Sequence, residues 1–68
     1  MTLTTSERHL AALYFFGDNL STAAVIREAL PDIHCPHTIS IARSAIHKLE
    51  AMDRAAFIAQ LEEELYCA

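Results

Sequence analysis

Residues that turn or break a chain are scarce in this sequence. Glycine occurs once, proline occurs twice, and tryptophan is absent. Strands joined by tight turns depend on glycine, asparagine and proline, so this scarcity argues against a β-rich fold. Long apolar runs are missing too, since the longest, residues 10–16, has seven members. A membrane-spanning helix needs roughly 20 apolar residues, so we expect none here.

Cysteine and basic residues are also few. Two cysteines, Cys35 and Cys67, cannot build the dense disulfide framework of a small secreted protein, so we expect a cytoplasmic protein. Five lysines and arginines against nine aspartates and glutamates give a formal net charge of -4 at pH 7. This charge repels phosphate backbones and acidic membranes, so nucleic acid is a disfavoured partner.

The short length limits catalysis. A chain of 68 residues buries only about 60% of its extended surface on folding. A deep cleft that holds a nucleophile, an orienting group and an oxyanion site is hard to build in such a domain. We therefore expect no enzyme and no bound cofactor, and no small-molecule substrate is evident.

The residues that are present favour helices. Hydrophobic residues make up 53% of the chain, and twelve residues are alanine, the strongest helix former. We expect one all-α domain over residues 1–68, a compact three- or four-helix bundle with antiparallel neighbours and short loops. The expected helices cover about residues 5–16, 20–30, 36–52 and 54–66.

Capping signals support these boundaries. Thr4 and Glu7 have the spacing of a capping box, and Gly17 suits a left-handed cap after the first helix. Pro36 fits the first turn of the third helix, where its missing amide has no intrahelical acceptor. Side chains expected to cap the starts of the second and fourth helices are Asp18 or Asn19, and Asp53.

Apolar residues at helical spacing predict the core. They form one stripe on each of the last three expected helices. The expected stripes are Leu20, Ala23 or Ala24, Ile26 and Ala29 or Leu30; then Ile39, Ala42, Ile46 and Leu49; then Phe57, Ile58, Leu61 and Leu65.

The expected helix over residues 5–16 is apolar nearly all round in its second half. Such a helix must be covered on more than one side, either by the rest of its own bundle or by a partner. Aromatic residues are enriched at interface cores, so Tyr14, Phe15 and Phe16 are candidates for a homodimer seam or for a partner's docking site. Filling a small core with the same residues is the other interpretation.

DNA binding is the alternative from a different class. The helices over residues 20–30 and 36–52, with the corner between them, have the order of a helix-turn-helix motif. The second of them carries residue types that can hydrogen-bond bases, namely Ser40, Arg43, Ser44, His47 and Lys48. Two features argue against this alternative, because the corner contains no glycine and the basic residues are scattered.

A third hypothesis is a metal staple at the corner where His34, Cys35 and His37 lie together. Zinc needs three or four such ligands, and in a strict up-down bundle His9 or Cys67 reaches the same end. A disulfide between Cys35 and Cys67 at the same end of the bundle is an alternative to the metal site. The plainer interpretation is a helix-starting corner with solvated histidines and with Cys35 as a small buried hydrophobe.

Three consecutive glutamates, residues 62–64, fall late in the last expected helix. Carboxylates near the negative end of a helix dipole are mildly unfavourable. A basic partner surface compensates for this, although solvation alone also suffices.

Taken together, these features predict a small non-enzymatic protein-binding or accessory protein. We expect it to associate with itself or with a protein partner through its first helix.

Overall fold

The computed structural model describes the backbone of residues 2–66 and the side chains of residues 2–62. All the elements in this part of the chain are helices joined by short loops, and it contains no strand apart from an isolated bridge between Phe16 and Asp18. The elements are α1 (Thr5–Leu13), α2 (Asn19–Ala29), the short 3-10 helix η1 (Leu30–Asp32), α3 (Pro36–Ala51) and α4 (Arg54–Tyr66). The expected all-α helical bundle is confirmed.

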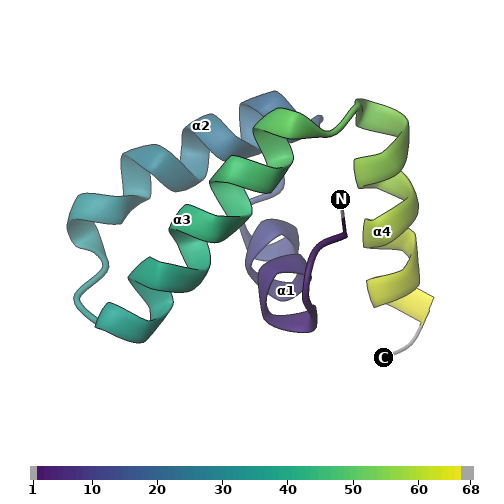
Figure 1. Ribbon diagram of the computed structural model, residues 1–68. Helices are drawn as coiled ribbons and strands as arrows, with labels where there is room; N and C mark the ends of the chain where they lie inside the picture. The colour runs from purple at the N-terminus through teal and green to yellow at the C-terminus, as the bar shows by residue number, and fades with distance from the viewer. Residues whose placement is uncertain (1, 67–68) are drawn as a thin grey trace.

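Helices α2 and α3 run antiparallel and side by side, and α1 crosses beneath them, seen almost along its own axis in Figure 1. Helix α3 packs against both α2 and α1, while α4 stands on the other side of α1 (Figure 1). The arrangement therefore departs from the strict up-down bundle on which the metal hypothesis depended, because α1 lies across its neighbours. Helix α1 packs against each of the other three α-helices.

The core lies where these helices cross. Its most deeply buried large side chains are Ile26, Leu49 and Phe57, each with an exposed fraction below 2%. Residues of all three expected stripes are buried, namely Ala23, Ile26, Ala42, Ile46, Leu49, Phe57 and Leu61. The expected core position Leu65 lies outside the side chains that the structure describes.

Leu20 was also expected in the core, and this prediction is wrong, since its exposed fraction is 61%. The buried face of α2 is formed by positions 19, 22, 23 and 26, which have the spacing of one helical face. Ala23 and Ile26 were expected there, but Asn19 and Thr22 are polar, so the apolar pattern alone chose Leu20 in place of Asn19 at the start of the face. Leu20 consequently points to solvent.

Asn19 is buried because its side chain caps the C-terminal end of another helix, α3. Its side-chain amide donates to the carbonyl oxygens of Leu49 and Met52, each at 2.7 Å. These carbonyls belong to the end of α3, where the last turn of a helix leaves acceptors without intrahelical donors. One side chain at the start of α2 thus satisfies the end of α3 and fixes the two helices together.

The predicted helix starts are confirmed. The Thr4 hydroxyl accepts from the Glu7 amide while the Glu7 carboxylate accepts from the Thr4 amide, which completes the capping box. Asp18 caps α2 by accepting from the Ser21 amide at 2.7 Å. Pro36 is the first residue of α3, and Asp53 accepts from the Ala56 amide at 2.8 Å.

The predicted end of the first helix is wrong, because α1 stops at Leu13 instead of Phe16. The amide of Phe16 donates to the Thr22 hydroxyl at 3.0 Å, so it is turned away from the carbonyls of α1. Gly17 does take the positive φ expected of it, +92°, but it does so in the turn into α2 and not at the helix end. A side chain of α2 therefore ends α1 earlier than its apolar pattern indicates.

Candidate protein-binding surface

A short segment around the turn between α1 and α2 exposes four large hydrophobic side chains. Their exposed fractions are 70% for Leu13, 69% for Phe16, 61% for Leu20 and 45% for Phe15. We call these four residues the apolar surface. Single exposed hydrophobic residues are common on soluble proteins, but four within eight positions make this segment a candidate interaction site.

The three aromatic residues predicted to bind a partner have different positions. Phe16 points mostly to solvent, whereas Tyr14 is half-buried and packs against the core. Phe15 lies between these two states, since its ring stacks on the buried ring of Phe57 with centroids 6.0 Å apart. The structure thus divides the aromatic run between the core and the surface.

The turn that carries the apolar surface is held by several hydrogen bonds. Besides the bond from the Phe16 amide to Thr22, the Asp18 carboxylate accepts from Ser21. The backbone and side-chain hydrogen bonds from Ser21 lower the pKa of Asp18 below its ordinary value. Because these contacts fix the turn, ordering the aromatic residues on binding costs less than it does for a loose loop.

Two hollows border this turn, one lined by Phe15 and the other by Phe16. The first, of about 300 Å³, is lined by Ala12, Phe15, Ile58, Leu61 and Glu62, which come from α4 and the end of α1. The second, of about 440 Å³, is lined by Phe16, Ser21, Ala24, Val25 and Glu28, mostly from α2. Each hollow has one carboxylate residue in an otherwise uncharged lining.

The first hollow suits a side chain of a polypeptide better than a small molecule. Its size is at the lower end of the range of roughly 300–1,000 Å³ for small-molecule pockets. Such pockets also need several convergent polar groups to orient a ligand, and Glu62 is the one polar side chain among those lining the first hollow.

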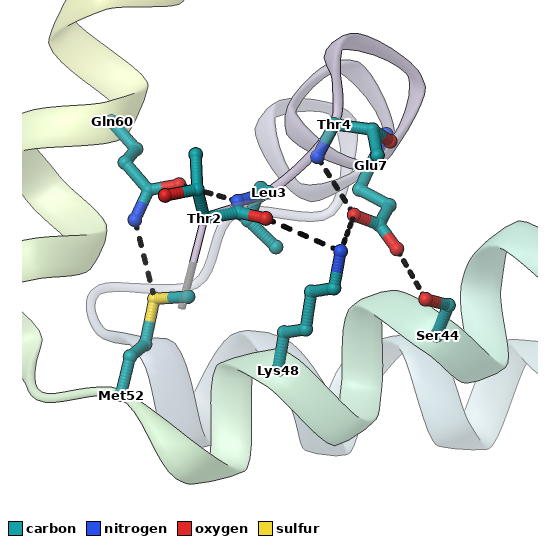
Figure 2. A network of polar contacts seen from close by, with 8 residues as sticks. All are labelled: Thr2, Leu3, Thr4, Glu7, Ser44, Lys48, Met52 and Gln60. Carbon is teal, nitrogen blue, oxygen red and sulfur yellow. Dashed lines mark hydrogen bonds and ion pairs between the residues drawn. The ribbon is translucent and has the colours of Figure 1, made fainter.

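A contrasting polar cluster lies at the other end of α1 (Figure 2). The Glu7 carboxylate, whose residue is only 3% exposed, accepts from Lys48 Nζ at 2.8 Å and from the Ser44 hydroxyl. Lys48 also donates to the Thr2 carbonyl oxygen at 3.2 Å. The cluster therefore ties α1 and the N-terminal segment to α3.

Two opposing effects set the pKa of Glu7. Burial raises it, but the hydrogen bond from Lys48, together with those from Ser44 and Thr4, outweighs burial and lowers the pKa to about 2. Glu7 is thus ionised over the whole neutral range. The capping box indicated where Glu7 lies in its helix, but nothing in the local pattern indicated its burial or its partners on α3.

This cluster bears on the five residues predicted to read DNA. Ser44 and Lys48 point toward Glu7 (Figure 2), whereas Arg43 and His47 line a separate hollow beside Arg27. Arg27 itself forms an ion pair with Glu50 at 2.9 Å. The remaining candidate, at position 40, is exposed. The five side chains therefore do not form one row along α3.

The corner predicted to hold a metal is exposed. His34, Cys35 and His37 all face solvent, so the expectation of Cys35 as a small buried hydrophobe is wrong. Hydrogen bonds from Thr38 to the Cys35 sulfur lower the pKa of this thiol. His9 and His37 line a common hollow, but within the described residues no three His, Cys, Asp or Glu side chains are grouped to hold a metal ion. Cys67 lies outside the described part of the chain.

Comparisons with known proteins give no match, whether against protein-family models, curated proteins or solved structures. None of the helices in residues 2–66 has both the length and the apolar character needed to cross a membrane. The class that the structure defines is an all-α helical bundle, and its functional assignment depends on the apolar surface.

Proposed function

We propose that the protein is a small, cytoplasmic, non-enzymatic binding module that docks a partner polypeptide on its apolar surface. The observation that carries the proposal is the exposure of Leu13, Phe15, Phe16 and Leu20 around one fixed turn. Exposed aromatic residues beside hollows of side-chain size are typical of the central contacts of protein interfaces.

The size of the surface sets the strength of binding. Burying what remains exposed of these four side chains contributes on the order of 4–7 kcal/mol. Association itself costs roughly 4–15 kcal/mol in lost freedom. The apolar surface alone therefore supports weak or transient binding, and a useful affinity requires further contacts around its edge.

The test is a selection from a phage-displayed peptide library. Wild-type protein is the bait, and the double variant Leu13→Ser with Phe16→Ser removes peptides that bind elsewhere. Enriched peptides are expected to bind the wild type at least about tenfold more tightly than the double variant, which corresponds to about 1.4 kcal/mol. A variant at a distant exposed position, Ser40→Ala, is expected to bind them as the wild type does.

An absence of enriched peptides, or peptides that bind the wild type and the double variant equally, would count against the proposal. Self-association through α1 is one form of the proposed function, and sedimentation of the wild type and the double variant over a range of concentrations detects it directly.

A further inference from the structure

The identity of the occupant can be inferred from the charges around the apolar surface. Glu62 lines the first hollow, Glu28 lines the second, and Asp18 lies in the turn between them. The side chains described as lining these two hollows include no lysine or arginine. Each hollow beside the apolar surface therefore combines an apolar lining with one carboxylate.

The basic residues that the structure describes lie mostly elsewhere. Lys48 is held by Glu7, and Arg27 pairs with Glu50 on the side of α2 that faces α3. Arg54 is the exception, since its charge acts on Asp18 from the start of α4. A bound partner therefore meets unneutralised carboxylates at the two hollows, Glu28 and Glu62, whereas the charge of Asp18 in the turn is offset by Arg54.

A second copy of this chain fits these charges poorly. In a two-fold dimer built on the apolar surface, the same patch of each copy faces the other. Glu28 and Glu62 of both copies then approach one another, and juxtaposed like charges oppose association. The same acidic edge repels an anionic membrane surface.

The position of Glu62 along its helix adds to this argument. It belongs to the second half of α4, so it lies toward the negative end of the helix dipole. Carboxylates there are unfavourable for the helix, and a bound cation relieves the cost. A partner with positive charge next to its apolar residues therefore satisfies both the edge of the surface and the end of α4.

We propose that the apolar surface binds an amphipathic helix of another protein, with leucine-like side chains on one face and lysine or arginine along its flanks. This inference rests on the proposed function and specifies the partner. A helix is the fitting element because the first hollow lies between α1 and α4, and a groove between helices takes the apolar ridge of a third. The described residues form no strand whose edge an extended peptide can extend.

The experiment uses three synthetic peptides of about 18 residues, long enough to form a helix. The first has an apolar leucine face with lysine elsewhere, the second replaces every lysine with glutamate, and the third scrambles the first so that no apolar face forms. Binding to the full chain is measured by calorimetry at about 20 and 150 mM salt. The basic amphipathic peptide is expected to bind at least about tenfold more tightly than the other two.

Protein variants test the two components separately. Glu28→Gln with Glu62→Gln is expected to weaken binding of the basic amphipathic peptide about three- to tenfold and to reduce its salt dependence. Asp32→Asn, an exposed carboxylate in η1 beyond the end of α2, is the matched control and is expected to leave binding unchanged. Leu13→Ser with Phe16→Ser is expected to abolish binding.

The outcomes separate the two proposals. Equal binding of the acidic peptide, or of the scrambled one, overturns the basic-helix inference. So does a dimer of the wild type that Phe16→Ser dissociates, because the occupant is then a second copy, although the proposed function stands. If the library yields peptides and the basic amphipathic peptide does not bind, only the present inference fails. If neither yields binding, both fail.

Discussion

The two ends of α1 depart in opposite ways from the usual rule that charged residues are exposed and large hydrophobic residues are buried. At its start a charged residue, Glu7, is 3% exposed, while at its end and in the following turn Leu13 and Phe16 are about 70% exposed. Charged residues are rarely buried unless they are paired, and Glu7 is paired with Lys48 and hydrogen-bonded by Ser44. Contacts within the fold therefore explain why Glu7 is buried at the start of α1.

Contacts within the fold do not explain why large hydrophobic residues are exposed at the end of α1 and in the following turn. Nothing in the described residues covers Leu13, Phe16 or Leu20, although the same chain buries Phe57 completely. The polar cluster stabilises the monomer, whereas the role that we propose for the apolar surface is contact with a partner. Three predictions probe this difference, beginning with the largest effect.

The largest effect is expected where an aromatic ring is buried. Phe57→Ala is expected to lower the free energy of unfolding by about 3–5 kcal/mol, because it removes a fully buried side chain and leaves a cavity. Phe16→Ala, the same change on an exposed ring, is expected to alter it by less than about 0.5 kcal/mol. Urea unfolding measures both values.

A domain of this size has a total stability of roughly 3–10 kcal/mol, so Phe57→Ala is able to prevent folding. Phe57→Leu keeps most of the volume and removes the stack on Phe15, and its expected cost is about 1–2 kcal/mol. Equal costs for the substitutions at Phe57 and Phe16 would contradict the division between core and surface.

The polar cluster predicts a dependence of stability on pH. The pKa of Glu7 is lowered from 4.5 to about 2 in the folded protein. Its contribution, about 3 kcal/mol, is therefore fully present above pH 4.5 and is lost as the pH falls through about 2. Urea unfolding at a series of pH values between about 7 and 2.5 measures the loss.

Glu7→Gln is the matched control for this titration, since it keeps the shape of the side chain and removes the charge. Its stability is expected to be lower at pH 7 and to fall less in the acid range than that of the wild type. The lowered pKa of Asp18 gives a smaller dependence of the same sign, and Asp18→Asn measures that part separately. A wild type and a Glu7→Gln variant with parallel pH profiles would show that the cluster contributes nothing.

Much of the fold could be predicted from local chemistry. The capping box at Thr4, the cap at Asp18 and the proline at position 36 each depend on residues within a few positions, so the sequence places these helix starts correctly. The end of α1 depends instead on Thr22, which lies six positions from Phe16 and on another helix. Such a contact leaves no periodic signal.

The exposure of the candidate surface was predicted in part for the same reason. The aromatic run at residues 14–16 lies in the segment where the structure exposes Phe15 and Phe16, but Leu13 and Leu20 were not among the predicted partner-binding residues. Leu20 was expected in the core because the apolar pattern of α2 does not show that Asn19 and Thr22 are the buried residues. Their burial depends on bonds to the end of α3 and to Phe16, which only the packed structure supplies.

The smallest effect on stability is expected from the double variant Leu13→Ser with Phe16→Ser. Both side chains are mostly exposed and Phe16 fixes its turn through its backbone amide, which serine retains. The free energy of unfolding is therefore expected to change by no more than about 0.5–1 kcal/mol in urea unfolding. A loss of several kcal/mol would instead make these residues part of the monomer's own stability. A variant that stays folded but no longer binds peptides separates a role in binding from a role in stability. Residues that serve binding alone can be changed without a loss of the fold.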